Sequence, residues 1–250
     1  MAITKQLSIP ANWEALTDTQ LKDIATLLYS NPNEKQFAIK ALHILINPNN
    51  TIKKNKLLGL ILSNYRLEDL KPHMAFLYKD TNRKTFIKEI NINDTYYIAP
   101  QPFLFNISIY EFSIADDFYM RFRKAKTRKD QLMYLRYMAA VLYVPESSSP
   151  KRPVFYLETI EQLVQPFNTC NTKDLYAMLV AYQGCRFLLE KRYKKVFKSA
   201  AGTPKGPTKN YGFGKVILEM AGGKFGDHQT TKQTLLHTFL EQWDQDLTKK

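Results

Sequence analysis

Signals for the start of a helix recur along the whole chain and constrain its fold more than any other feature. Thr17 and Gln20 have the spacing of a capping box, in which each side chain accepts a hydrogen bond from the other residue's backbone N–H. Leu21, Ile24 and Leu28 then repeat at the period of a helix. This stretch is therefore predicted to be an amphipathic helix.

The same pattern predicts most of the remaining chain to be helical. Further helices are expected to begin near Asn33 and to cover roughly 51–63, 108–124, 132–143, 157–164, 172–197, 211–222 and 229–247, with capping boxes at Ser108–Glu111 and Thr230–Gln233. Glycine occurs only 9 times, where average usage predicts roughly 17. This scarcity argues against nucleotide-cradling loops and against turn-rich β architectures.

Three short stretches between the helices have a different character. Met74–Tyr78, Thr85–Ile90 and Thr95–Ile98 are rich in β-branched or aromatic residues and are separated by Asp and Asn turns. The predicted fold is therefore mainly α, a multi-helix assembly with a small antiparallel β hairpin or three-stranded sheet near residues 74–98.

Two domains are predicted from this arrangement. Residues 1–104 would form a helical unit with the small β insertion, and residues 105–250 a helical domain that ends in a pair of helices. The stretch 145–153 is rich in proline and serine, which is typical of a loop or hinge. Residues 199–210 lack large apolar side chains and are expected to form a flexible basic loop.

Positive charge is concentrated in two clusters. The chain has 36 Lys and Arg against 23 Asp and Glu, a formal net charge of +13. The candidate electrostatic residues lie within 121–129 and 191–209; they are Arg121, Arg123, Lys124, Lys191, Arg192, Lys194 and Lys195. Such clusters can bind nucleic-acid phosphates or an acidic protein surface. The alternative is that they only complement the negative ends of helix dipoles.

The residues that usually carry chemistry form no recognisable motif. The four histidines and two cysteines are His43, His73, His228, His237, Cys170 and Cys185. No histidine pair has the spacing of a helical metal site, so no metal and no cofactor are predicted. Glu111, Asp116 and Asp117 are the only candidates for an acid–base or Mg²⁺ site, but a solvated helix face or a local counter-charge to the basic run that follows is the default interpretation. The protein is therefore predicted not to be an enzyme.

The last predicted helix has a wide apolar stripe. Leu236, Phe239, Leu240 and Trp243 belong to it and are the candidate partner-binding residues. The stripe could pack on the body of the protein, or it could belong to a detachable or oligomer-forming helix, which leaves a homo-oligomer open.

Three stretches in the second half carry a family resemblance. They are Ile109–Phe118 followed by Leu132–Pro145, then Tyr182–Phe197, and finally Gly214–Gly226 before the amphipathic terminal helix. Their order resembles proteins encoded among the tail genes of phages and prophages of Bacteroidetes-type bacteria. The C-terminal part is similar to phage tail assembly chaperones, which hold the tape-measure protein soluble before the tail tube forms.

The resemblance implies a non-enzymatic assembly or chaperone-like protein that binds other polypeptides during phage tail morphogenesis. Its partner would be a tape-measure or other tail protein, engaged by exposed apolar faces at 229–247 and 132–143. The alternatives are a nucleic-acid-binding protein and a structural virion component. No secretory signal or membrane-spanning stretch is visible, so the expected location is the host cytoplasm or the virion, with no membrane partner.

Overall fold

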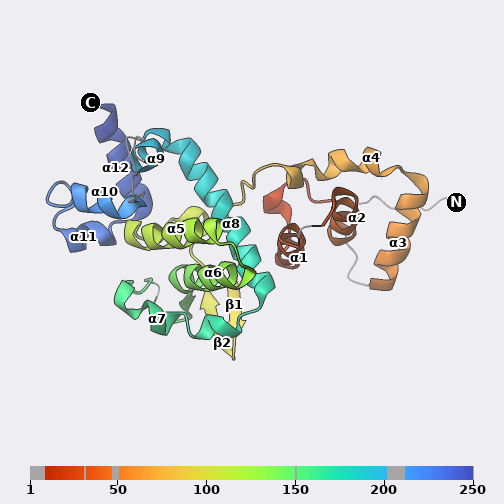
Figure 1. The fold of residues 1–250 in the computed structure, drawn as a ribbon, viewed down its shortest axis with the longest axis horizontal. Helices are drawn as coiled ribbons and strands as arrows, with labels where there is room; N and C mark the ends of the chain where they lie inside the picture. Colours follow the sequence, from red (N-terminus) through yellow and green to blue (C-terminus); the bar gives the residue numbers. More distant parts are fainter. Residues whose placement is uncertain (1–8, 31, 47–50, 150, 202–211, 250) are drawn as a thin grey trace.

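A computed structural model describes residues 9–30, 32–46, 51–149, 151–201 and 212–249. These residues are mainly α-helical and contain one small, antiparallel, three-stranded sheet, which confirms the predicted fold class. Figure 1 shows the first helices grouped on one side, a central group formed by α5, α6 and α8, and the last helices on the other side.

The N-terminal group consists of short helices. They are η1 (Trp13–Ala15), α1 (Asp18–Leu28), α2 (Glu34–Leu45), α3 (Thr51–Asn64), α4 (Leu67–Leu70) and η2 (Lys71–Tyr78). The capping box of Thr17 and Gln20 is present at the start of α1, and Asn33 caps α2. The helices predicted in this part of the chain are thus confirmed, because their caps are local hydrogen bonds.

The strand predicted at Met74–Tyr78 is wrong, since these residues end the 3₁₀-helix η2. Pro72 lies in the first turn of this helix, where its missing N–H costs nothing. Met74 and Leu77 are buried and Tyr78 is exposed, so burial follows a three-residue spacing rather than the alternation of a strand.

The sheet combines a local hairpin with a distant third strand. Strands β1 (Glu89–Ile92) and β2 (Thr95–Ile98) are joined by Asn93 and Asp94, both at positive φ, as a tight hairpin turn requires. The third strand, β3 (Val144–Pro145), pairs with β2 on its other side. The sheet thus begins later than predicted, at Glu89, and takes a strand from beyond residue 104, the predicted domain boundary.

Three longer helices form the centre of the molecule. They are α5 (Ile109–Lys124), α6 (Arg128–Leu142) and α8 (Thr172–Arg192), with η3 (Pro102–Leu104) preceding α5. The predicted capping box of Ser108 and Glu111 is present. Helices α5 and α6 pack together along their lengths, while α8 packs against α1 on one side and α6 on another. Every residue from Asp174 to Tyr182 is buried, so α8 connects the N-terminal helices to the rest of the core.

The remaining helices are shorter than predicted. They are η4 (Leu157–Thr159), α7 (Ile160–Leu163), η5 (Pro166–Thr169), α9 (Lys194–Ala201), α10 (Gly212–Met220), α11 (His228–Gln233) and α12 (Leu236–Thr248). The helix predicted over 172–197 is interrupted at Tyr193, whose φ of −116° and ψ of 51° are not helical. Most of the predicted flexible loop, 202–210, lies outside the described residues.

The predicted helix over 229–247 is two helices, because tertiary hydrogen bonds hold the chain between them extended. The Leu236 N–H donates to the Ile107 carbonyl at 2.9 Å, and the Ile109 N–H donates to the Thr234 carbonyl at 2.9 Å. The predicted capping box at Thr230 and Gln233 is wrong. Asp227 caps α11 instead, accepting from the Thr230 N–H at 2.8 Å.

Candidate functional site

The apolar stripe of the last helix lies in the core. Leu236, Phe239 and Leu240 have no exposed surface, and Trp243 is 5 % exposed. Helix α12 packs against α5 and α9, and the Trp243 ring meets that of Phe213 edge-on. The expectation that these four residues form an exposed binding face is therefore wrong. The apolar side of α6 is buried in the same way, against α5 and α8.

Glu111 is occupied by a buried ion pair. The Arg152 Nε donates to Glu111 Oε1 at 2.6 Å, and both side chains are less than a tenth exposed. The other carboxylate oxygen, Oε2, accepts from the Ser108 N–H at 2.8 Å as part of the helix cap. Arg152 Nη2 also donates to the last carbonyls of α6, those of Val141 and Leu142. Arg152 thereby anchors the predicted loop at 145–153 to the core.

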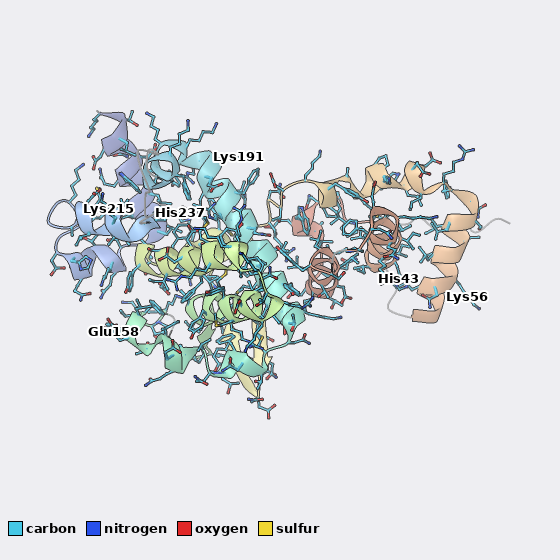
Figure 2. All side chains as sticks on the ribbon, viewed as in Figure 1. His43, Lys56, Glu158, Lys191, Lys215 and His237 are labelled. Carbon is cyan, nitrogen blue, oxygen red and sulfur yellow. The ribbon has the colours of Figure 1, made fainter. Side chains whose placement is uncertain are left out.

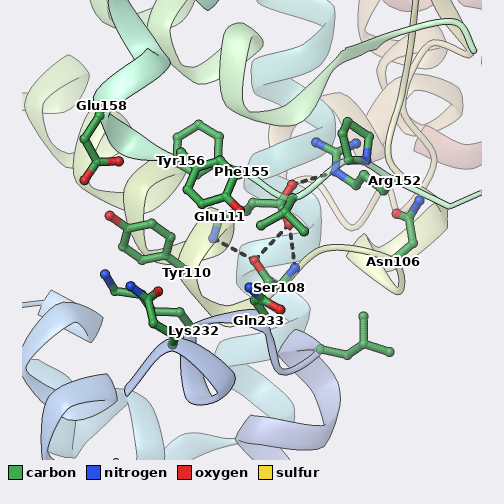
Figure 3. Close-up of a pocket in the computed structure, with 14 residues that line it drawn as sticks. Asn106, Ser108, Tyr110, Glu111, Arg152, Phe155, Tyr156, Glu158, Lys232 and Gln233 are labelled. Carbon is green, nitrogen blue, oxygen red and sulfur yellow. Dashed lines mark hydrogen bonds and ion pairs between the residues drawn. The ribbon is translucent and has the colours of Figure 1, made fainter. Parts of the chain in front are cut away.

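A small cavity of about 170 Å³ adjoins this ion pair (Figure 3). Tyr110, Phe155 and Glu158 line it, and the Lys232 ammonium lies 4.6 Å from the centre of the Tyr110 ring. The cavity therefore holds a cation of the protein's own chain over its main aromatic ring.

Asp116 is likewise paired, with two residues of α8. Its Oδ1 accepts from the Tyr182 hydroxyl at 3.0 Å and from the Arg186 Nε at 2.6 Å. Asp117, its neighbour, is exposed on another side of α5. The three carboxylates that were candidates for acid–base chemistry thus do not converge on a common site.

The cysteines are buried and unreactive. Cys170 and Cys185 are not bonded to each other, and burial raises the pKa of the Cys170 thiol to about 12. Burial raises the pKa of Cys185 as well, so neither thiol ionises near neutral pH. Among the residues that the structure describes, no group of three His, Cys, Asp or Glu side chains is placed to hold a metal ion.

The first basic cluster forms a continuous exposed surface at the junction of α5 and α6. We call it the basic turn; its members are Arg121, Arg123, Lys124, Lys126, Arg128 and Lys129, all of them exposed. None makes an ion pair with a carboxylate of the described residues. Several of the guanidinium groups lie over aromatic rings, at 5.9 Å for Arg121 over Phe118 and for Arg123 over Tyr119.

The helix dipole does not account for the basic turn. Arg121, Arg123 and Lys124 lie in the last turn of α5, where cations are favoured. Arg128 and Lys129, however, are the first two residues of α6, where the positive end of the dipole disfavours them. The helix dipole therefore favours only the part of the cluster that lies at the end of α5.

The second basic cluster is partly neutralised within the protein. Arg192 pairs with Glu241 at 2.8 Å, and Lys195 donates to the Thr248 hydroxyl at 3.1 Å. The Lys191 ammonium lies 4.3 Å from the centre of the Phe187 ring, and Lys194 is exposed. Arg192 therefore fastens α12 to the end of α8, and Lys195 fastens it to the start of α9. Lys205 and Lys209 lie outside the described residues.

A cleft of about 500 Å³ lies beside the basic turn, between the N-terminal helices and α8. Its aromatic lining consists of Trp13, Tyr29, Tyr119 and Phe187, and its polar lining consists of Lys79, Asp80, Thr81, Arg123, Gln183, Arg186 and Glu190. Because Arg123 belongs to both the basic turn and the cleft wall, the two features form one continuous site.

Sequence reasoning identified the basic turn but missed the cleft. The residues that line the cleft come from separate stretches between Trp13 and Glu190, and no local pattern unites them. The only sequence signal was the presence of Tyr119 beside the basic residues.

Comparisons with known proteins give no information about the function of this chain. No family model, no curated protein and no solved structure matches this chain significantly. In the part of the chain that the structure describes, no helix is both long and apolar enough to cross a bilayer.

Proposed function

We propose that this protein binds nucleic acid, with the basic turn holding the phosphate backbone. The observation that carries the proposal is the set of six exposed cations, none of which lies within ion-pair distance of a carboxylate of the described residues. Nucleic acid fits such a surface because it offers closely spaced negative charges, and binding to it releases condensed counterions. The adjoining aromatic cleft adds the second element of a nucleic-acid site, since bases stack on aromatic rings.

The test is the salt dependence of binding, measured by fluorescence anisotropy on a labelled single strand. The variant Lys124→Ala/Lys126→Ala/Lys129→Ala removes three phosphate contacts. The slope of log affinity against log salt should then become shallower by about 2, given about 0.7 per contact for a single strand.

A matched control removes the same charge elsewhere. Lys35, Lys40 and Lys56 are exposed cations of α2 and α3, and Figure 2 shows Lys56 on the outer helix α3. The variant Lys35→Ala/Lys40→Ala/Lys56→Ala should leave the slope close to that of the unmodified protein. Equal effects of the two variants, or no binding by the unmodified protein at low salt, would refute the proposal.

A second proposal is an assembly role in a phage tail, favoured by the exposed apolar side chains at the end of α3. Leu60 is 61 % exposed, Leu62 is 36 % exposed and Tyr65, just beyond the helix, is 59 % exposed. The end of α3, rather than the buried face of α12, would then be the surface where another polypeptide binds.

Co-expression with a tape-measure-like chain from the same genome tests this second proposal. The variant Leu60→Asp/Leu62→Asp should abolish co-purification. Leu218→Asp, on α10, alters a leucine that is equally exposed at 62 % and should retain the partner. Unchanged co-purification of the α3 variant would exclude this surface.

A further inference from the structure

The cleft beside the basic turn has walls that are held in place before any ligand arrives. The ring of Tyr29 stacks on that of Tyr176 at 4.8 Å, and its hydroxyl donates to Gln183 Oε1 at 3.1 Å. Elsewhere in the lining, the Asp116–Arg186 ion pair holds the guanidinium 5.5 Å from the centre of the Tyr119 ring. Ligand binding would therefore cost little ordering of these side chains.

Several polar groups of the cleft have unused hydrogen-bonding capacity. The Gln183 amide nitrogen and the Asp80 carboxylate have no partner among the described residues. The Thr81 hydroxyl accepts from the Arg83 N–H, but its own proton has no acceptor there. The cleft thus offers two donors and one strong acceptor between aromatic walls, the combination that recognises the edge of a nucleobase.

Phe187 is a half-buried ring in the lining of the cleft. The ammonium of the exposed Lys191 side chain lies 4.3 Å from the centre of this ring. The volume of about 500 Å³ falls in the range of sites that enclose a small organic group.

We propose that the cleft receives an unpaired base of a nucleic-acid strand, so that the protein prefers single strands to duplexes. This inference rests on the proposed function, because the phosphates next to the bound base would lie on the basic turn. Arg123 lies at the boundary between the two and would contact the phosphate nearest to the base.

Three labelled probes of equal length distinguish binding of the bases from binding of the sugar–phosphate backbone. They are a mixed-sequence single strand, a strand in which every base is replaced by an abasic site, and a duplex. The two single strands carry the same charge, so the basic turn alone would bind them equally. The expected result is an affinity for the mixed-sequence strand about tenfold above that for the abasic strand, the contribution of one stacked base.

The variant Phe187→Ala should lower the affinity for the mixed-sequence strand about tenfold and leave the affinities for the abasic strand and the duplex unchanged. Tyr96→Ala is the matched control, because Tyr96 is an exposed ring on β2 that does not line the cleft. It should bind all three probes as the unmodified protein does.

Photocrosslinking of the unmodified protein covers the case in which Phe187→Ala fails to fold. A strand containing 4-thiouridine should crosslink to peptides that include 119–123 or 183–190. Crosslinks confined to 124–129, or equal affinity for the mixed-sequence and abasic strands, would overturn the base-binding inference while leaving the proposed function standing. Absence of binding to all three probes would refute both.

Discussion

The buried carboxylates among the described residues are each paired with a cation. Arg152 pairs with Glu111, Arg186 with Asp116, and Lys22 with Asp174. An isolated ion would cost several kcal/mol to remove from water, so such groups persist in a core only when they are paired and hydrogen-bonded. Glu111 and Asp116, which the sequence offered as catalytic candidates, therefore have a structural role in the fold.

The Glu111–Arg152 pair allows this role to be measured. Glu111→Gln keeps an oxygen for the helix cap but leaves the Arg152 guanidinium without a counter-charge, and it should lower the free energy of unfolding by about 3 kcal/mol. Arg152→Met should cost a similar amount. The double variant should lose less than the sum, as urea denaturation would report. Strict additivity would show that the two side chains are not coupled.

At the level of the elements, local hydrogen bonds explain which predictions succeed. The caps at Thr17 and Ser108 are confirmed, because a cap depends on residues three positions apart. The interruption at Tyr193 and the separation of α11 from α12 could not be predicted in this way. The Leu236 N–H donates to the carbonyl of the distant Ile107 instead of to a helical partner, so α11 and α12 are separate helices.

Gly184 marks the closest approach between α8 and another segment. A Cβ atom at this position would lie 2.2 Å from the Arg83 carbonyl oxygen and 2.5 Å from the Arg83 nitrogen. Both neighbours are backbone atoms, so they cannot rotate away. The helix and the stretch around Arg83 can therefore pack this closely only with glycine.

Gly184→Ala should consequently destabilise the protein by about 1–3 kcal/mol or more, the cost of an overpacked core. Gly59→Ala is the control within a helix, because nothing lies within 4 Å of its added Cβ. Alanine there should raise stability by about 0.5–1 kcal/mol. Thermal unfolding followed by circular dichroism would show a lower melting temperature for Gly184→Ala and a higher one for Gly59→Ala. A higher melting temperature for both variants would contradict the close packing at Gly184.

Across the whole molecule, α12 is a component of the core. His237 donates from Nε2 to the Phe103 carbonyl at 2.8 Å, and its ring stacks on Phe105. Burial lowers the pKa of His237, which favours the neutral ring that this packing requires. The terminal helix is therefore bound to the segment that leads into α5.

Truncation after Gly226 should unfold the surrounding core and not merely release a binding helix. Each large apolar side chain removed contributes about 1.5–3 kcal/mol of burial energy, and the deletion takes Leu236, Phe239, Leu240 and Trp243 together. Hydrogen exchange should show lost protection in α5 and α10 as well. Native protection of those helices in the truncated chain would show that α12 is detachable.

The sequence by itself determined the helical class, most helix starts and the basic turn, because these depend on residues close together in the chain. Only the tertiary structure decided which apolar faces are buried, where α9 and α12 begin, and how the cleft is formed. These outcomes depend on contacts between distant segments, such as those that join α8 to α1 and α12 to α5. An apolar stripe looks the same in sequence whether it meets the protein's own core or another chain, and only the packed structure shows that α12 meets its own core.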